Sequence, residues 1–209
     1  MANLWTNLSN KQALDTMNGA WDCGYRYFDT SPYYGVGLAE HRLGSFLREK
    51  PEDSYIVSTK IGRVLKPYVG PDLENCERGR FTNGLNFTYK WDFSYDGVMR
   101  SFEDSYQRTS IRKIDLLTIH DLDLLHHSQE ERDHYTKDLE GGFKAMQKLK
   151  EAGLIKAIGV GVNDPKSLKN IMHNFDLDYI LVAMMYNMLD QTMYDDEFKF
   201  IEKNQIGMI

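Results

Sequence analysis

The chain has 209 residues, of which 42% are hydrophobic and 12% aromatic, so it is long enough to bury one large core. Its length suggests one domain or two small ones, and we favour a single domain spanning residues 1–209. Its formal net charge is -6 at pH 7, and Lys and Arg are spread along the chain. This distribution argues against the concentrated basic face that binds nucleic acid or an anionic membrane surface, so small molecules are the expected partners.

Cysteine use and the absence of apolar runs indicate the cellular setting. Cys23 and Cys76 form no CxxC pair, so we predict neither a metal site nor a disulfide framework. No apolar run approaches the roughly 20 residues that a membrane span needs. The first ten residues also lack the basic and then apolar pattern of a signal peptide. We therefore expect a soluble, cytoplasmic protein.

Helix and strand signals alternate along the chain. The first helix is marked by Ser9 and Gln12 in capping-box spacing and by Gly24 as its end. A later helix is marked by Asp164 as N-cap and Pro165 as its first residue. The predicted helices cover residues 9–24, 38–50, 95–108, 139–153, 163–175 and 195–204, and the predicted strands cover residues 25–30, 54–60, 113–120, 155–162, 178–185 and 206–209.

This alternation predicts an α/β fold in which parallel strands are joined by right-handed crossovers. A doubly wound sheet would carry GxGxxG after its first strand, but "GVGLAE" and "GVGVND" each supply only two of the glycines. A (β/α)8 TIM barrel instead places its catalytic groups at the C-terminal ends of several strands. Titratable residues do occur at these ends, so we favour the barrel.

Four residues stand at or just after predicted strand ends, namely Asp29, Tyr34, Lys60 and His120. Each alone also has a structural interpretation: a turn or capping aspartate, a loop tyrosine, a solvated lysine and a hydrogen-bonded core histidine. A barrel would bring all four to one face. Their conjunction therefore favours a catalytic site.

Such a set suits proton transfer to or from a carbonyl oxygen. A phenol with a pKa near 10 is a weak acid at neutral pH, but the ammonium of Lys60 could lower the pKa of Tyr34. Asp29 would keep that lysine charged and in position. His120 could donate a hydrogen bond to the substrate oxygen. No side chain supplies a hydride, so a nicotinamide cofactor is implied.

Four ordered blocks carry a resemblance to a known family: "FDTSPYYG" followed by Glu40 and Leu43-Gly44, "VSTKIG", "IDLLTIHD" and "GLIKAIGVGVN". In order and approximate spacing they resemble the aldo-keto reductase superfamily. Further segments resemble its branch of D-threo-aldose 1-dehydrogenases, L-fucose dehydrogenases and pyridoxal 4-dehydrogenases: "YDGVMRSFEDSYQR", "HDLDLLHH" and residues 141–163. The resemblance implies that Tyr34 is the acid or base and that Asp29, Lys60 and His120 support it.

The resemblance also implies a cofactor site for NADP or NAD, with NADP the preferred expectation. Asp29 and Asn163 are expected to contact the cofactor, with Gly161 standing where family members usually have a serine. Tyr186 matches the aromatic residue on which the nicotinamide ring stacks, and Ala183 stands where many members have a glutamine. Both departures are compatible with the aldose dehydrogenase branch.

Residues 66–94 read as a long loop on the catalytic face, beyond the usual length of a connection and suited to a substrate lid. Its residues Arg80, Phe81, Tyr89 and Trp91 would line a sugar or ring pocket. We interpret His126 and His127 as part of a polar loop rather than a metal pair, because no third ligand lies at a suggestive spacing.

Compared with the family, the chain is expected to hold about strands 2 to 7 of the barrel, without the first strand and the C-terminal region that binds the cofactor phosphate. Such an open barrel invites self-association through its unpaired edges. Three hypotheses follow: an NAD(P)-dependent oxidoreductase of aldoses or small aldehydes and alcohols, a non-catalytic binding or regulatory subunit of the same fold, or an inactive truncated fragment.

Overall fold

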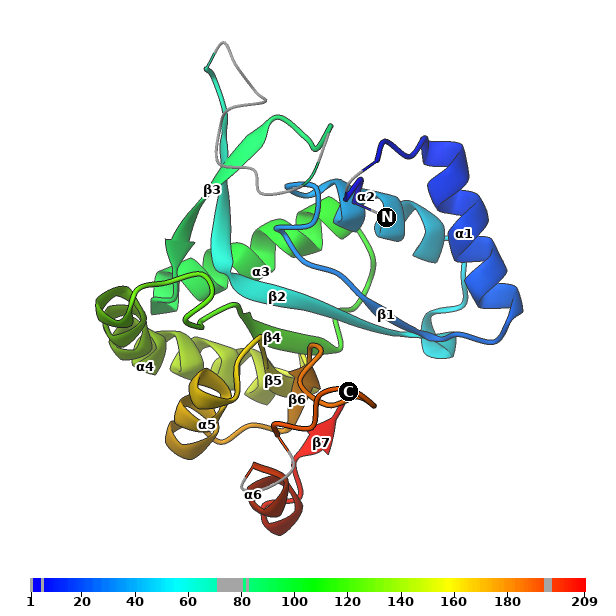
Figure 1. The fold of residues 1–209 in the computed structure, drawn as a ribbon. Helices are drawn as coiled ribbons and strands as arrows, with labels where there is room; N and C mark the ends of the chain where they lie inside the picture. Colours follow the sequence, from blue (N-terminus) through cyan, green and yellow to red (C-terminus); the bar gives the residue numbers. More distant parts are fainter. Residues whose placement is uncertain (1, 5, 71–80, 82, 194–196) are drawn as a thin grey trace.

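The structure is a computed structural model and describes residues 2–4, 6–70, 81, 83–193 and 197–209. Its centre is a sheet with the strand order β1-β2-β4-β5-β6-β7, in which every neighbouring pair is parallel (Figure 1). The strands are β1 (Tyr27–Asp29), β2 (Ile56–Pro67), β4 (Leu116–His120), β5 (Ala157–Val162), β6 (Tyr179–Val182) and β7 (Gly207–Met208), and β3 (Phe87–Asp92) pairs with β2 outside this path.

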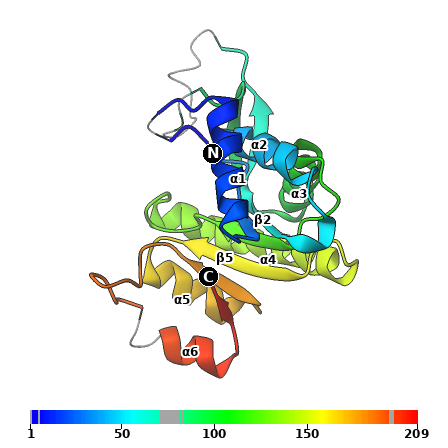
Figure 2. The same ribbon diagram turned by 90° about the vertical axis from the view of Figure 1, so that its right-hand side faces the viewer.

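One helix precedes β1, and the others lie in the connections between successive parallel strands. The helices are α1 (Asn10–Asp22), α2 (Leu38–Leu47), α3 (Tyr95–Thr109), α4 (Gln129–Glu151), α5 (Pro165–Asn174) and α6 (Glu197–Lys203), with a short 3-10 turn η1 (Glu52–Ser54) before β2. Figure 2 shows α1 and α2 towards one end of the strand series and α5 and α6 towards the other. Within the described ranges no pairing joins β1 to β7, so the sheet is an open arc. The predicted incomplete (β/α)8 barrel is confirmed.

The caps predicted from the sequence form as expected. Ser9 and Gln12 make the reciprocal capping box of α1, and the Asp164 side chain accepts from Ser167 N at the start of α5. Helix α4, in contrast, begins ten residues before the predicted start at residue 139, because Ser128 and Glu131 form a second capping box. Helix α4 is therefore nearly three turns longer at its N-terminal end than predicted, and the added residues are mostly polar.

The predicted long loop of residues 66–94 is wrong in part. Strand β2 continues to Pro67 and forms an antiparallel hairpin with β3, whose register pairs Gly62 with Asp92 and Pro67 with Phe87. The first half of β2 lies instead in the parallel sheet, where Ser58 pairs with Leu116. One long strand thus links the main sheet to a hairpin that projects away from it (Figure 1).

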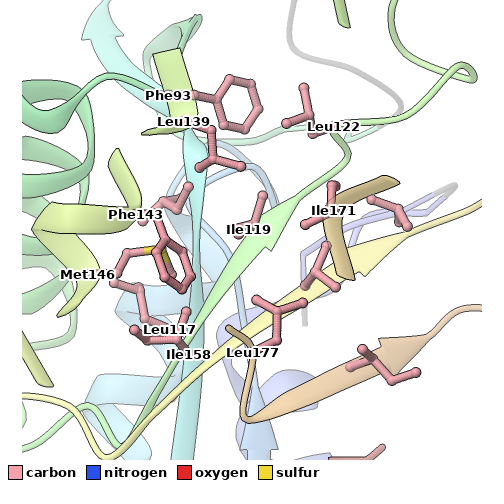
Figure 3. Packing of buried hydrophobic residues seen from close by; sticks show 14 of the residues in the cluster. Phe93, Leu117, Ile119, Leu122, Leu139, Phe143, Met146, Ile158, Ile171 and Leu177 are labelled. Carbon is pink, nitrogen blue, oxygen red and sulfur yellow. The ribbon is translucent and has the colours of Figure 1, made fainter. Parts of the chain in front are cut away.

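The main core lies between the sheet and helices α3, α4 and α5. Alternation along β4 points Leu117 and Ile119 into this core, where they pack with Phe143 and Met146 of α4 (Figure 3). The intervening residue, Thr118, lies on the opposite face and hydrogen-bonds Tyr179. Hydrophobic burial on the helix side therefore fixes the register that presents polar side chains on the other side.

A smaller core joins α1 and α2 to the start of β2. Met17, Phe46 and Val57 are among its buried residues. Gly44 allows α2 to approach the end of α3, because a Cβ atom there would lie 1.9 Å from the carbonyl oxygen of Thr109. No helix of the described ranges is long and apolar enough to cross a membrane.

Candidate active site

The sheet register brings three of the four predicted residues to one edge. Asp29 ends β1 and pairs with Ser58, Lys60 lies two residues further along β2, and His120 ends β4. Tyr34 follows β1 in the turn that leads into α2, where its backbone N–H bonds to the carbonyl of Ser31. The predicted convergence at the C-terminal ends of parallel strands is observed.

Lys60 and Asp29 form a charge pair between neighbouring strands. The Lys60 side chain is only 2% exposed, and its ammonium donates to the Asp29 carboxylate and, at 2.9 Å, to the Thr30 carbonyl. Ser58 donates to the other carboxylate oxygen of Asp29. Burial lowers the pKa of Lys60, while Asp29 opposes this by favouring the charged form. Asp29 thus holds the lysine ammonium in position.

Tyr34 lies against Lys60 and His120. The Lys60 Nζ atom is 5.0 Å from the centre of its ring, and the His120 ring is perpendicular to it with centroids 5.8 Å apart. Burial raises the pKa of Tyr34, and the negative charges of Asp29 and Asp121 raise it further. This direction is opposite to the expected effect of Lys60, because burial is the largest cause of the shift and the two carboxylates add to it. Tyr34 is therefore a neutral phenol at pH 7 and carries a proton to donate.

His120 is a buried, neutral imidazole. Burial holds its pKa well below the usual range, and the positive charges of Lys60 and Arg63 lower the pKa further. Ser31 Oγ lies 3.2 Å from its Nδ1 atom. A neutral ring has one N–H donor, so His120 can polarise a substrate oxygen by a hydrogen bond.

Arg63 and Asp121 complete the site and were not predicted. Arg63 Nη1 donates to Asp121 Oδ2 at 2.7 Å, and both side chains are buried. Strict alternation along a strand would place residues 60 and 63 on opposite faces. Gly62, with φ of 115°, interrupts the alternation and lets Lys60 and Arg63 reach the same site. The glycine in "KIGR" is the sequence signal that could have revealed this arrangement.

Aromatic residues of β3 and of the segment before it lie beside Tyr33 and Tyr34. Phe81 lies with its ring centroid 5.0 Å from that of Tyr33 and 5.9 Å from that of Tyr34, and Tyr89 is 5.6 Å from Tyr33. Tyr89 in turn contacts Trp91 at 5.8 Å. These three predicted pocket residues therefore form an aromatic wall at the site.

The fourth predicted pocket residue, Arg80, lies outside the described residues, as do Cys76 and most of the loop around them.

Two of the expected cofactor contacts lie on β5 and just beyond it. Gly161 pairs with His120 in the sheet. Asn163 donates its side-chain amide to Asp121 at 3.1 Å and to Asp123 at 2.8 Å. Its Nδ2 atom is thus committed to carboxylates, which leaves its carbonyl oxygen as the atom suited to a cofactor amide.

The remaining positions considered for the cofactor site follow β6. Ala183 is the first residue after this strand. Tyr186 is 43% exposed and packs against Phe198 with ring centroids 4.7 Å apart. A partly exposed aromatic ring at the C-terminal edge of the sheet fits the expected role as a stacking platform.

The loop after β4 gathers more ligand-type groups than its spacing suggested. Oxygen and nitrogen atoms of Asp121, Asp123 and His126 lie within 4.8 Å of one another. Their arrangement is accounted for by hydrogen bonds, since His126 Nδ1 lies 2.8 Å from Asp123 and Asp121 is paired with Arg63. His127 instead packs on the Trp91 ring at 4.3 Å. We therefore regard the cluster as a polar network.

A parallel α/β arc with Asp, Tyr, Lys and His at its C-terminal edge is the arrangement expected of a barrel-type site. The sequence of residues 1–209 matches the Aldo/keto reductase family over its whole length. The chain belongs to this family.

Curated relatives agree with the branch expected from the sequence. The chain is 38% identical to pyridoxal 4-dehydrogenase of Microbacterium luteolum, covering 100% of the chain and 63% of the relative. It is 36% identical to D-threo-aldose 1-dehydrogenase of a Pseudomonas species, covering 100% of the chain and 61% of the relative. The chain thus spans about three fifths of the length of these proteins.

Solved structures show the same fold. Aldo-keto reductase from Bacillus halodurans in its holo form superposes with a TM-score of 0.73 at 20% identity, covering 100% of this chain and 58% of that one. Glycerol dehydrogenase from Gluconobacter oxydans gives a TM-score of 0.70 at 24% identity, covering 100% and 55%. At these identities the comparison establishes the fold.

Proposed function

We propose that this chain carries the proton-transfer site of an NAD(P)-dependent oxidoreductase that acts on an aldose or another small aldehyde or alcohol. The observation that carries the proposal is the convergence of Tyr34, Lys60, Asp29 and His120 at one sheet edge. Membership of the family and the two dehydrogenase relatives support it. The proposal treats residues 1–209 as a single catalytic domain.

Tyr34 acts as the proton donor in the reducing direction. Its raised pKa keeps the phenol protonated, and a substrate alkoxide that forms beside it is a strong enough base to take the proton. Lys60 then stabilises the phenolate left behind, and Asp29 keeps the ammonium in place. In the oxidising direction Tyr34 would have to lose its proton first, so the phenolate that accepts the alcohol proton forms at a cost set by the raised pKa.

His120 orients the substrate oxygen. It is neutral, so it donates a hydrogen bond without giving up its proton, and it stands perpendicular to the Tyr34 ring. The substrate oxygen would thus be held between a hydrogen-bond donor and a proton donor. Removing one such donor from an active site costs about 10² to 10³ in rate.

The residues present fit a nicotinamide cofactor. Tyr186 offers a partly exposed ring for stacking and Asn163 a side-chain carbonyl oxygen, while Asp29 and Gly161 border the site. When bound, the cofactor supplies or accepts the hydride that no side chain provides. Either NADP or NAD satisfies this chemistry. A sugar or an aromatic aldehyde would pack on the wall of Phe81, Tyr89 and Trp91.

The test compares Tyr34→Phe with the wild type, using Tyr55→Phe as a matched control in a buried tyrosine outside the site. Hydride transfer is followed by nicotinamide absorbance with a panel of aldoses and aldehydes. Tyr34→Phe should lose at least about 10²-fold in kcat and retain cofactor binding, while Tyr55→Phe should retain both. Normal turnover by Tyr34→Phe would rule out the proposed role. Hydride transfer by the pure wild-type protein would exclude a non-catalytic subunit.

A further inference from the structure

Arg63 is a buried cation next to the catalytic histidine. Its guanidinium carbon lies 3.9 Å from the ring centres of both Tyr33 and Trp91, so it is held by contacts with two aromatic rings. Its side chain is 2% exposed and bonds to Asp121. This arrangement fixes the guanidinium in one place, because stacking and an ion pair restrain it together.

The atoms around His120 distinguish its two ring nitrogens. Arg63 Nη1 lies 3.4 Å from Nδ1, and Ser31 Oγ lies 3.2 Å from the same atom. Asp121 Oδ2 lies 3.4 Å from the other nitrogen, Nε2. Nδ1 therefore faces a group that only donates hydrogen bonds, and Nε2 faces a group that only accepts them.

These neighbours select one tautomer of the neutral ring. A proton on Nδ1 would point an N–H bond at a guanidinium and leave the Nε2 lone pair beside a carboxylate. A proton on Nε2 makes both approaches attractive, and Ser31 can then donate its hydroxyl proton to Nδ1. Arg63, Asp121 and Ser31 therefore decide which nitrogen of His120 carries the proton.

We propose that Arg63 is a positioning residue that, with Asp121 and Ser31, holds His120 as the Nε2–H tautomer. Its consequence for catalysis rests on the proposed function: the substrate oxygen would replace Asp121, 3.4 Å away and already paired with Arg63, as the acceptor of the Nε2–H group while Tyr34 transfers its proton. Arg63 itself does not touch the reacting atoms. It acts through the imidazole.

The tautomer is measured directly by 15N NMR of histidine-labelled protein at pH 7.5, since protonated and unprotonated ring nitrogens have well-separated shifts. The His120 signals are assigned by their loss in His120→Gln. The wild type should show Nε2–H as the dominant form. Arg63→Lys keeps a donor-only cation and should retain this form.

Arg63→Met alone would leave the buried Asp121 carboxylate unpaired and endanger folding. The double variant Arg63→Met/Asp121→Asn removes both charges, and its amide spectrum shows whether the fold persists. We expect the ratio of Nε2–H to Nδ1–H to fall by about tenfold or more in this variant, the scale of a lost charge-assisted hydrogen bond. In kinetics, kcat should fall by no more than the same factor, because activity follows the fraction of the competent tautomer, and KM should change less.

Two results would overturn the proposal: an Nδ1–H tautomer in the wild type, or an unchanged tautomer ratio in the folded double variant. Both are read in the free protein and need no turnover. If the wild type carried Nε2–H as predicted but transferred no hydride to any substrate, the proposed function would fail and the assignment of Arg63 would stand.

Discussion

Buried histidines connect the site to the stability of the chain. Burial lowers the pKa of His120 well below 6.5, and it also lowers the pKa of His127. Below pH 6.5 the unfolded chain therefore binds protons that the folded protein does not. Stability must then fall as the pH decreases through this window, with a slope of up to about 1.4 kcal/mol per pH unit for each such group.

We predict that His120→Gln reduces the slope of the free energy of unfolding against pH by the contribution of about one proton. The free energy of unfolding, measured in urea at pH 8 and at pH 5.5, should differ less in the variant than in the wild type. His120 is uncharged in both states at pH 8, so the difference between variant and wild type there does not report its protonation. An identical pH dependence in the two proteins would show that His120 is not held neutral by the fold.

At the scale of elements, β2 is the strand on which the site depends. It joins the parallel sheet at Ser58 to Ile61 and the hairpin from Gly62 onward, and Lys60 and Arg63 stand on either side of this change. Gly62 has a positive φ, and a Cβ atom there would lie 2.6 Å from the Phe93 ring. Both the backbone angle and the close approach require glycine.

We predict that Gly62→Ala lowers the free energy of unfolding by about 2 to 3 kcal/mol and displaces Arg63 from His120. The control is Gly19→Ala in α1, where a Cβ atom meets nothing within 4 Å. That change should stabilise the protein by about 0.5 to 1 kcal/mol. Urea unfolding of both variants measures the contrast, and equal stabilities would contradict the role given to Gly62.

Elements with strong periodicity or caps were predictable from sequence. The caps at Ser9 and Asp164 and the helix of residues 95–109 lie where the pattern placed them. The start of α4 was missed because residues 129–138 are almost entirely polar and show no apolar period. The β2–β3 hairpin was missed because β3 is only half-buried and its turn signals resemble those of a loop.

The site was predictable to the extent that it depends on strand ends. Asp29 and His120 end their strands, and Lys60 lies one residue before the end of the part of β2 that pairs with β4, so topology alone brings them together. Arg63 was hidden because its position depends on one unusual backbone angle. The pKa of Tyr34 was also misjudged, since it reflects burial and two carboxylates that only the folded structure brings near.

At the scale of the whole molecule, the described chain is an open parallel arc whose helix side holds the main core and whose C-terminal edge holds the site. Every residue proposed to contact the cofactor lies at this edge or in the segments that follow its strands. Trp91, 3.9 Å from the guanidinium of Arg63, provides a spectroscopic reporter beside the site.

The most direct test of the account is a titration of the purified protein with NADPH and, separately, with NADH, following tryptophan quenching and nicotinamide emission. We predict saturable binding of at least one of the two, with similar affinity in Tyr34→Phe because that variant keeps the ring and loses only the hydroxyl. Failure of both cofactors to bind the folded wild-type protein would contradict the claim that this chain forms a nicotinamide-dependent site.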